Sequence, residues 1–599
     1  MRDVSARASR VKTSMLIPFS LTIIFTIAGL LLTLLLAWAA WRHRDPRAIA
    51  DSGRPEGPGE FGTTATNRWI RGLRIGFVML LLAVFGFHSY WVFKADSTDE
   101  FTRSKRFDAR NRRLAESGLK GWVLDRSGKL DSALIRYRND AGRISREYPL
   151  GDAAVHLTGY SDFVFGAGGM EFAFRDWLTA PASTFNRLAS AVPVGKDLKV
   201  SIDSNLQREA FELLDRTRKP AAAVVLLLPN NEVLAMASTP SFEPRSVSDE
   251  TTWRRMSDQA EQAQDISPFV NRALGTLVTG GSAFYYRPGS TFKVFTAAAA
   301  IDSGMTSERF TCRAEGFTPP ASGRSIKDYG GEVHGSIGLA DAFRHSCNQY
   351  FAQLGTKLGR ARLGDYARRL HFAVSSDDTS RATALWHTAH GDPKEFAFIF
   401  APPVQRMNLS SDASPYDVAL QSIGQGFDDL SVIQMALIAS AVASSDGAYV
   451  APTFEVGAQR KVINQFISAQ SAAKLRELMR LVVQSGTGAG AFKSMGRGLT
   501  AGGKTGTADR EVTAYDREGK PVVYIDSEGK QHTKRVGVTD SWFVGFAPAE
   551  NPRIAYAVMV ENGGQGAHVA APISVKLIER AAELGYLTGG IEPARAGHN

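Results

Sequence analysis

The longest uncharged stretch of the chain constrains its fold more than any other feature. No charged residue occurs from Thr13 to Trp41, and the sequence SMLIPFSLTIIFTIAGLLLTLLLAWAAW within this stretch is predominantly apolar. The stretch is longer than the roughly 20 residues that a helix needs to cross about 30 Å of hydrocarbon. It is also longer than the apolar region of a cleavable signal peptide, which has about 7–15 residues. We therefore predict a transmembrane helix over residues 14–41.

A second uncharged stretch, from Ile75 to Phe93, is just long enough to form another span. It ends in Tyr90, Trp91 and Phe93, aromatic residues of the kind that gather where a membrane meets water. The alternative is a buried core helix, but nothing nearby in the sequence could supply the core around it. We predict a second transmembrane helix at 75–93.

The charges around the two spans indicate their orientation. The loop 42–74 carries seven arginines, more than the tail before the first span, and cytoplasmic loops are enriched in Lys and Arg. The loop should therefore lie in the cytoplasm and residues 95–599 outside it. Six basic residues between Arg103 and Arg113 also follow the second span, so the chemistry of the large domain must decide the orientation.

Overall charge gives no reason to expect a nucleic-acid partner. The formal net charge of the chain is +10, and +7 of it falls in residues 1–94. The basic excess therefore belongs to the membrane segments rather than to a binding face of the large domain.

Beyond residue 198 the sequence indicates strands at both ends of a helical region. Residues 198–214 read as a short strand and a helix capped near Asp203, and residues 221–238 read as a hairpin. Two more strands are expected within 540–562, whereas 290–480 is rich in Ala and mostly helical. This pattern predicts an α/β (α+β) fold in which strands far apart in the sequence close a central sheet and a helical subdomain is inserted.

A serine and a lysine three residues apart are the first candidate catalytic pair. Ser290 follows Arg-Pro-Gly at the start of an apolar helix, and Lys293 lies on the same helix face, where its amine can act as the base for the serine hydroxyl. The spacing alone is weak evidence, because Ser471 and Lys474 repeat it in an amphipathic stretch where we expect both to face solvent. Other residues must distinguish the two pairs.

Two further motifs follow Ser290. Ser346-Cys347-Asn348 lies 56 positions after it, and Lys504-Thr505-Gly506-Thr507 begins a further 158 positions on. Taken alone, the first could be a helix N-cap and the second an edge strand after a Gly-rich turn. Together and in this order, the three motifs resemble Ser-x-x-Lys, Ser-x-Asn and Lys-Thr-Gly of the penicillin-recognising serine enzymes, which converge on one cleft.

The resemblance runs from about residue 118 to 580, and within those enzymes it is closest to the class B penicillin-binding proteins. Residues 121–128, 148–160 and 168–171 resemble the pedestal segment that precedes the catalytic domain in that family. The family is made of monofunctional D,D-transpeptidases of cell elongation or division, usually with one membrane anchor rather than two. The resemblance implies the penicillin-binding transpeptidase fold with a central antiparallel sheet after an elongated, non-catalytic pedestal.

The expected segments are an N-terminal tail at 1–13, transmembrane helix 1 at 14–41, a basic cytoplasmic loop at 42–74, transmembrane helix 2 at 75–93, the pedestal at 94–197, the transpeptidase domain at 198–588 and a C-terminal tail at 589–599.

The resemblance also implies a role for each motif residue. Ser290 would attack the carbonyl of the penultimate D-alanine of a pentapeptide stem, with Lys293 as the base. The pKa of Lys293 should then lie roughly three units below 10.4, lowered by burial and by the second cation Lys504. Ser346 would relay the proton to the departing amine, and Asn348 would orient Lys293 and the substrate amide.

The third motif is expected to bind the substrate. Lys504 and Thr505 would hold its terminal carboxylate on a strand that continues through Gly506 and Thr507. The backbone N–H groups of Ser290 and Thr507 would form the oxyanion hole. We expect no metal or organic cofactor, because the chain has no metal-ligand motif. The two cysteines of the chain are too few for a Cys-based zinc site, and they allow one disulfide without requiring it.

Three alternative activities share this acylation chemistry. A serine β-lactamase is a compact soluble enzyme, whereas this chain carries two predicted spans and an extra segment of about a hundred residues. A D,D-carboxypeptidase uses water as the acceptor, and only the pedestal-like segment argues against it. A penicillin-binding sensor or scaffold that acylates and stops should carry an intracellular effector, and the loop 42–74 is too small to be one.

The expected partners and location follow from the class B resemblance. We expect peptidoglycan stem peptides, β-lactam antibiotics, the membrane, and a multi-spanning glycosyltransferase of the SEDS family that supplies glycan. The chain should sit in the bacterial cytoplasmic (inner) membrane with its catalytic domain on the extracytoplasmic (periplasmic) side.

Overall fold

The structure is a computed structural model in which the chain forms two compact units, residues 1–113 and 114–599. In the first unit only residues within 72–90 are described, and they are helical. The predicted first span at 14–41 and most of the loop after it lie outside the described residues, as does part of the second span at 75–93. Among the described residues, no helix is both long and apolar enough to cross a membrane. In the second unit the described residues are 119–140, 143–179, 195–261, 267–279, 284–375, 378–379, 404–426, 428–514, 521–526 and 530–588.

The second unit is built on a five-stranded antiparallel sheet of order β17-β20-β21-β7-β8. The hairpin predicted from the sequence is confirmed as β7 (Ala221–Leu227) and β8 (Glu232–Thr239), and both strands are largely buried. Strands β20 (Arg535–Ala547) and β21 (Ile554–Val560) come from the far end of the chain, and β17 (Gly502–Thr513) forms one edge of the sheet. Strands distant in the sequence therefore close one sheet, as predicted.

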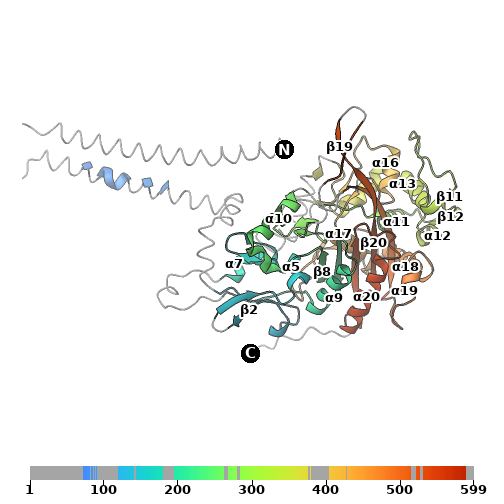
Figure 1. Cartoon of the computed structure of the whole chain (residues 1–599). Coiled ribbons are helices and arrows are strands. Elements are labelled where there is room, and N and C mark those ends of the chain that lie inside the picture. Colours follow the sequence, from blue (N-terminus) through green and yellow to red (C-terminus); the bar gives the residue numbers. More distant parts are fainter. Residues whose placement is uncertain are drawn as a thin grey trace, which may run out of the picture. The chain divides into compact units, whose positions relative to one another are not determined.

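Helices cover the sheet. Helix α9 (Ser204–Asp215) begins at Asp203, whose carboxylate accepts the N–H groups of Asn205 and Leu206, so the predicted cap is confirmed. It packs beside α20 (Ala570–Glu583) on β8 and β21 (Figure 1).

The other face of the sheet carries helices of the inserted region. The apolar helix α17 (Val432–Ala443) is buried throughout and packs on β7, β20 and β21. Helices α11 (Lys293–Asp302) and α18 (Ala469–Ser485) contact α17 and each other. The inserted region also contains α12 (Leu339–Arg344), α13 (Asn348–Arg369) and α16 (Pro415–Gln421).

The segment before the large sheet has a four-stranded sheet of its own, of order β3-β2-β1-β6. Its strands are β1 (Val123–Leu124), β2 (Ala133–Asp140), β3 (Arg143–Glu147) and β6 (Leu198–Lys199), the last of which pairs in parallel with β1.

A buried ion cluster fixes this segment. Glu171 is fully buried, and its carboxylate lies 3.1 Å from Lys120 Nζ and 2.7 Å from Arg146 Nε. Burial alone would raise the pKa of Glu171, but the two cations outweigh it and lower that pKa. Removing either cation would leave a buried charge without one of its partners.

Candidate active site

The turn that carries Ser290 is held against the edge strand. Ser290 lies in the 3-10 turn η5 (Gly289–Phe292), which leads into α11. Gly289 has a φ of +54°, and a Cβ on it would stand 2.5 Å from the carbonyl oxygen of Thr507. Only glycine fits this close approach, so the backbones of the Ser290 turn and of Thr507 in β17 are in contact. The N–H of Gly289 also donates to the carbonyl of Gly424 at 2.9 Å.

Lys293 begins α11 and points toward the second motif. Its fully buried ammonium Nζ donates to the Ser346 carbonyl oxygen at 2.6 Å, to Ser346 Oγ at 3.3 Å and to Asn348 Oδ1 at 2.7 Å. Burial lowers the pKa of Lys293 from its ordinary 10.5 to about 8, although the nearby thiols and Asp328 oppose this shift. The direction expected from the sequence is thus confirmed with burial as its main cause, whereas the repulsion expected between the two lysines lowers the pKa of Lys504 instead.

The second motif forms a tight turn before a long helix. Ser346 has a φ of +60°, a left-handed conformation that costs a non-glycine residue roughly 1–2 kcal/mol. Cys347 follows as the N-cap of α13, and Asn348 is the first residue of that helix. The segment is therefore a helix N-terminus, and the turn directs the carbonyl and hydroxyl of Ser346 at Lys293.

Lys504 reaches the same hydroxyl from the edge strand. It lies in β17 opposite Val544, is fully buried, and donates to Ser346 Oγ at 2.8 Å and to the Thr505 carbonyl at 3.0 Å. Burial, together with the charge of Lys293, lowers the pKa of Lys504 well below its ordinary value. Two lysines from different segments of the chain thus share one serine oxygen.

The rest of β17 is shaped by close packing. The hydroxyls of Thr505 and Thr487 are hydrogen-bonded at 2.5 Å. A Cβ on Gly506 would stand 2.7 Å from the Thr291 methyl group, so this glycine lets β17 lie directly against the Ser290 turn. Thr507 Oγ1 accepts the N–H of Gly566 at 3.5 Å.

Comparison with known proteins identifies the fold and the family. Residues 221–579 match the family model described as the penicillin binding protein transpeptidase domain. The chain belongs to this family.

Its relatives include class B members. The chain is 28% identical to the peptidoglycan D,D-transpeptidase PbpA of Mycobacterium tuberculosis, over 73% of this chain and 84% of that protein. It is 26% identical to the peptidoglycan D,D-transpeptidase MrdA of Acinetobacter baumannii, over 77% and 72% of the two chains.

Solved structures agree with this family and fold. The crystal structure of PBPA from Mycobacterium tuberculosis superposes with a TM-score of 0.60 at 25% identity, covering 78% of this chain and 100% of that one. The penicillin G acyl-enzyme complex of the same protein gives a TM-score of 0.59 at 25% identity, with the same two coverages.

The structure of this penicillin-binding protein brings four of the five predicted catalytic residues into one hydrogen-bonded cluster. Lys293, Ser346, Asn348 and Lys504 are joined directly. No hydrogen bond joins the hydroxyl of Ser290 to Lys293 among the described residues, although both lie on one turn of helix at the cluster. In unliganded enzymes catalytic hydrogen bonds are often long and tighten only when substrate binds.

The second Ser-x-x-Lys pair corrects one expectation. Lys474 is exposed as expected, but Ser471 is 5% exposed, so the expectation that both face solvent is wrong. Ser471 begins an apolar stripe of α18 that continues through Leu475 and Met479, and its hydroxyl accepts a hydrogen bond from Ser468 Oγ at 2.8 Å. No member of the catalytic cluster is bonded to it in the described part of the chain.

The structure adds two residues that the sequence analysis did not assign to the site. Thr487 is bonded to Thr505, and Asp328 accepts hydrogen bonds from the start of α13. Thr487 lies in a Gly-Thr-Gly turn that the resemblance covered, whereas Asp328 lies in an irregular loop without periodicity.

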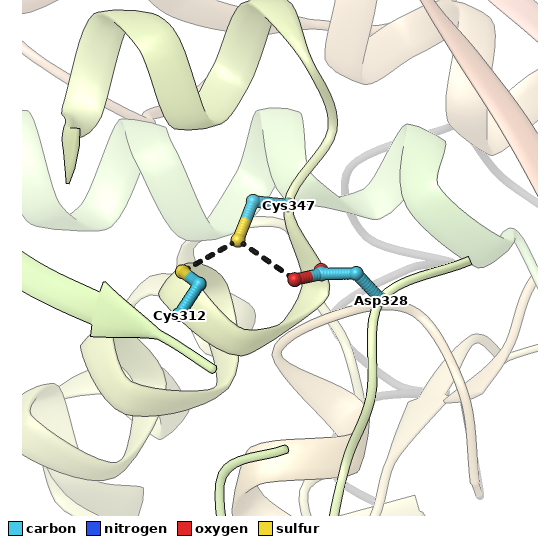
Figure 2. Close-up of side chains that lie close together, drawn as sticks. All are labelled: Cys312, Asp328 and Cys347. Atoms are coloured by element: carbon cyan, nitrogen blue, oxygen red, sulfur yellow. Dashed lines mark hydrogen bonds between the residues drawn. The ribbon is translucent and has the colours of Figure 1, made fainter. Parts of the chain in front are cut away.

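Only one set of three side chains among the described residues brings possible metal-ligand atoms within 4.8 Å of one another. This set consists of Cys312, Asp328 and Cys347, all buried (Figure 2). Both cysteines are free thiols, with 2.9 Å between their sulfurs. Asp328 Oδ1 accepts the backbone N–H groups of Asn348 and Gln349, while Oδ2 lies 3.3 Å from Cys347 Sγ and 3.4 Å from His334 Nδ1.

Proposed function

We propose that this chain is a peptidoglycan D,D-transpeptidase, which crosslinks stem peptides through an acyl-serine intermediate and is acylated by β-lactams. The observation that carries the proposal is the cluster in which Lys293 and Lys504 meet at Ser346, directly beside the turn of Ser290. Membership in the penicillin-binding transpeptidase family and relatives named peptidoglycan D,D-transpeptidases support it.

The first half-reaction forms the acyl-enzyme. Ser290 Oγ attacks the carbonyl carbon of the penultimate D-alanine while Lys293, in its neutral form, accepts the hydroxyl proton. The carbon–nitrogen bond then breaks, and the terminal D-alanine leaves as an amine that takes a proton through Ser346. Lys504 and Thr505 hold the carboxylate of that D-alanine, one as a cation and the other as a hydroxyl donor.

The second half-reaction transfers the acyl group. An amine of a second stem peptide attacks the ester carbon and loses a proton to the neutral base, and the ester oxygen leaves as Ser290, which regains its proton. The backbone N–H groups of Ser290 and Thr507 stabilise the oxyanion in both steps. Loss of one such donor commonly costs about 2.7–4 kcal/mol of transition-state stabilisation.

A pair of serine variants tests the nucleophile. Ser290→Ala should abolish covalent labelling by a fluorescent penicillin, whereas Ser471→Ala should leave it intact, because only Ser290 lies beside the two-lysine cluster. Labelling that persists in Ser290→Ala would refute the assignment of the site.

Turnover of a thioester stem analogue then separates the three activities that share acylation. A transpeptidase consumes the analogue faster when an amine acceptor is added and forms the amide product. Release of free acid regardless of the amine would indicate a carboxypeptidase, and a single stoichiometric acylation would indicate a sensor or scaffold.

We further propose that two spans anchor the chain in the cytoplasmic membrane with the catalytic domain on the extracytoplasmic side. The uncharged stretches and the basic loop between them support this topology. Cysteines placed at Ser5 and Ser52 test it in a Cys312→Ala, Cys347→Ala background. A membrane-impermeant thiol reagent on spheroplasts should modify the first and spare the second. With the catalytic domain outside, the reverse result would mean that one of the two proposed spans does not cross the membrane.

A glycan polymerase of the SEDS family is the proposed membrane partner. A monofunctional transpeptidase makes no glycan, so it must work beside an enzyme that does. The contact surface should be membrane-proximal, in the spans and the segment 95–171, which carry no catalytic motif. Charge reversal at Arg110, Arg112 and Arg113 should reduce co-purification with the polymerase while penicillin labelling of Ser290 stays normal. Unchanged co-purification would place the contact elsewhere.

A further inference from the structure

Four side chains that can bind a metal ion converge beside the second motif. The ligand atoms of Cys312, Asp328 and Cys347 lie within 4.8 Å of one another, and all three residues are buried. His334 adds a nitrogen, because its Nδ1 lies 3.4 Å from Asp328 Oδ2. The proposed reaction assigns no step to any of the four side chains.

A short hairpin brings Cys312 and His334 to one place. Cys312 ends strand β11 (Arg309–Cys312), which pairs in antiparallel register with β12 (Gly335–Gly338). In this register Cys312 stands opposite the first residue of β12, and His334 directly precedes that residue. The thiol and the imidazole therefore belong to the same end of the hairpin, although they are far apart in the sequence.

Asp328 and Cys347 meet at the start of α13. Asp328 lies in the loop between β11 and β12, directly before the 3-10 turn η6 (Tyr329–Gly331), and its side chain is 2% exposed. Its Oδ1 accepts the backbone N–H groups of Asn348 and Gln349, which fixes the orientation of the carboxylate. Its Oδ2 consequently points at Cys347 Sγ, 3.3 Å away at the N-cap of α13 (Figure 2).

The distances between these atoms fit a tetrahedral zinc ion. Zinc bonds of about 2.3 Å to sulfur and about 2.0–2.2 Å to nitrogen or oxygen place two ligand atoms about 3.4–3.8 Å apart. The nitrogen–oxygen distance between His334 and Asp328 is 3.4 Å, and the sulfur–oxygen distance between Cys347 and Asp328 is 3.3 Å. Both pairs therefore stand close to the separation that a shared zinc ion requires.

The two sulfurs point to the same conclusion. They are 2.9 Å apart, which is too short for two hydrogen-bonded thiols and longer than a disulfide bond of about 2.05 Å. Both can bind one zinc ion if they separate by about 0.9 Å. The ion would also offset the negative charge of a carboxylate and two thiolates gathered in a buried place.

The kinds of ligand indicate which metal binds. Thiolate and imidazole ligands suit zinc, whereas Ca²⁺ and Mg²⁺ prefer oxygen atoms. A set of four protein ligands without an open position is typical of structural rather than catalytic zinc sites.

Neighbouring groups orient two of the ligands. His334 Nε2 faces the carboxylate of Glu332 at 3.4 Å, and a histidine that binds metal through one ring nitrogen usually donates the other N–H to such a group. Gln349 Nε2 donates to Asp328 Oδ2 at 3.1 Å. That oxygen carries two lone pairs, so it can accept this bond and also bind a metal ion.

We propose that Cys312, Asp328, His334 and Cys347 bind one structural Zn²⁺ ion. The ion joins the hairpin of β11 and β12, the loop before η6 and the start of α13. This proposal departs from the expectation of no metal, which considered Cys-based sites and compact ligand motifs. The two cysteines are 35 positions apart, and the other two ligands are of different residue types.

The ion would support the turn that holds Lys293. Cys347 lies between Ser346 and Asn348, whose oxygens accept the hydrogen bonds of Lys293. Ser346 has a left-handed conformation, which persists only where its surroundings enforce it, and a metal bond to the next residue does so. Loss of zinc should therefore lower the melting temperature and slow penicillin labelling. The second of these effects rests on the proposed acylation of Ser290.

Metal content tests the site directly in the untagged full-length protein. Protein purified in detergent without chelators should retain about one zinc ion per chain after dialysis, measured by inductively coupled plasma mass spectrometry. When zinc is replaced by Co²⁺, the absorption spectrum should show a thiolate-to-cobalt band and the visible bands of tetrahedral cobalt. Absence of both zinc and the thiolate band would overturn the proposal, and so would a disulfide between the two cysteines. The cobalt spectrum needs neither a variant nor activity, so it decides even if the variants below do not fold.

Variants assign the ligands. Cys312→Ser, Asp328→Asn and His334→Ala should each weaken zinc affinity at least about tenfold in competition with a chromophoric chelator. His345→Ala is the control for a nearby histidine, because its ring lies 5.8 Å from that of His334. Asp203→Asn is the control for a buried helix cap and should lower the melting temperature while zinc stays bound. Unchanged affinity in the ligand variants, or an equal loss in both controls, would overturn the site.

Removal and return of zinc test its structural role. The zinc-free wild-type protein should melt at least about 3 °C lower and react more slowly with a fluorescent penicillin. Added Zn²⁺ should restore both values, whereas Mg²⁺ should restore neither. A melting temperature that does not depend on bound zinc would overturn the structural role. A wild-type protein that binds zinc but is not labelled at Ser290 would refute the proposed function and leave the metal site supported.

Discussion

Substituting Asn348 by Asp tests whether Lys293 acts as the base. The amide oxygen of Asn348 lies 2.7 Å from Lys293 Nζ, and an aspartate there would place a negative charge at hydrogen-bond distance from the ammonium. An opposite charge this close commonly moves a pKa by 1–3 units toward the charged form. The pKa of Lys293, which burial lowers to about 8, should therefore rise to about 9 or higher in Asn348→Asp.

The size of the effect on rate follows from the neutral fraction of the base. With a pKa of about 8, about one-tenth of Lys293 is neutral at pH 7, so acylation should run about tenfold below its alkaline plateau. A pKa one unit higher lowers the rate at pH 7 by about another tenfold. The variant also loses the hydrogen bond from Asn348 Nδ2 to the Lys327 carbonyl, so its plateau should fall as well. The measurement that matters is therefore the pH at which the acylation rate rises toward its alkaline plateau, called here the alkaline limb. The height of the plateau is less informative.

The assay is the second-order rate constant for labelling by a fluorescent penicillin between pH 6 and 10. Asn205→Asp is the control, because it adds the same charge at an exposed position of α9 away from the cluster. The reasoning is refuted if the wild-type limb is centred near 10, if labelling is independent of pH, or if Asn348→Asp leaves the limb where it was.

Four further outcomes are expected. Lys504→Ala should slow penicillin acylation at least about tenfold and move the alkaline limb of acylation to higher pH. The reason is that the charge coupling by which Lys293 lowers the pKa of Lys504 is reciprocal, so loss of Lys504 raises the pKa of Lys293. An unchanged limb would mean that Lys504 only binds the carboxylate. Gly289→Ala should nearly abolish labelling in folded protein, since a Cβ there meets the Thr507 carbonyl, and normal labelling would contradict this packing. Alkylation without reductant should add two labels to the denatured protein and none to the native protein in the same time, because both cysteines are free and buried; a mass showing no label after denaturation would reveal a disulfide. A penicillin with an esterified carboxylate should lose maximal acylation rate as well as affinity, whereas a loss of affinity alone would contradict a coupling between carboxylate binding and the protonation of Lys293.

Local patterns in the sequence predicted the elements that build the sheet. The hairpin of β7 and β8 and the cap of α9 follow from alternation, turn residues and a capping aspartate, all of which act within a few positions. The pairing of β7 with β21 follows from a broader argument, that apolar strands at the two ends of a domain need a common sheet.

Contacts made by irregular segments could not be predicted in this way. Asp328 stands 18 positions before Ser346 in a loop, and no period places its carboxylate under the start of α13. The burial of Ser471 could have been found, since Leu475 and Met479 repeat at helical spacing, but a polar residue at the head of an apolar stripe reads as exposed. The left-handed Ser346 is a further case, because it is enforced by bonds from distant segments.

The sharing of Ser346 Oγ explains how substrate binding can activate the base. This oxygen accepts from Lys504 at 2.8 Å and from Lys293 at 3.3 Å, and the three acceptors of Lys293 among the described residues match the three protons of its ammonium form. Burial and the charge of Lys293 lower the pKa of Lys504, so the two sites titrate as a coupled pair. A substrate carboxylate beside Lys504 favours the charged form of that lysine, and that charge in turn favours loss of the proton from Lys293. We therefore expect the carboxylate of stem peptide or penicillin to bind the site and to increase the neutral fraction of the base that deprotonates Ser290.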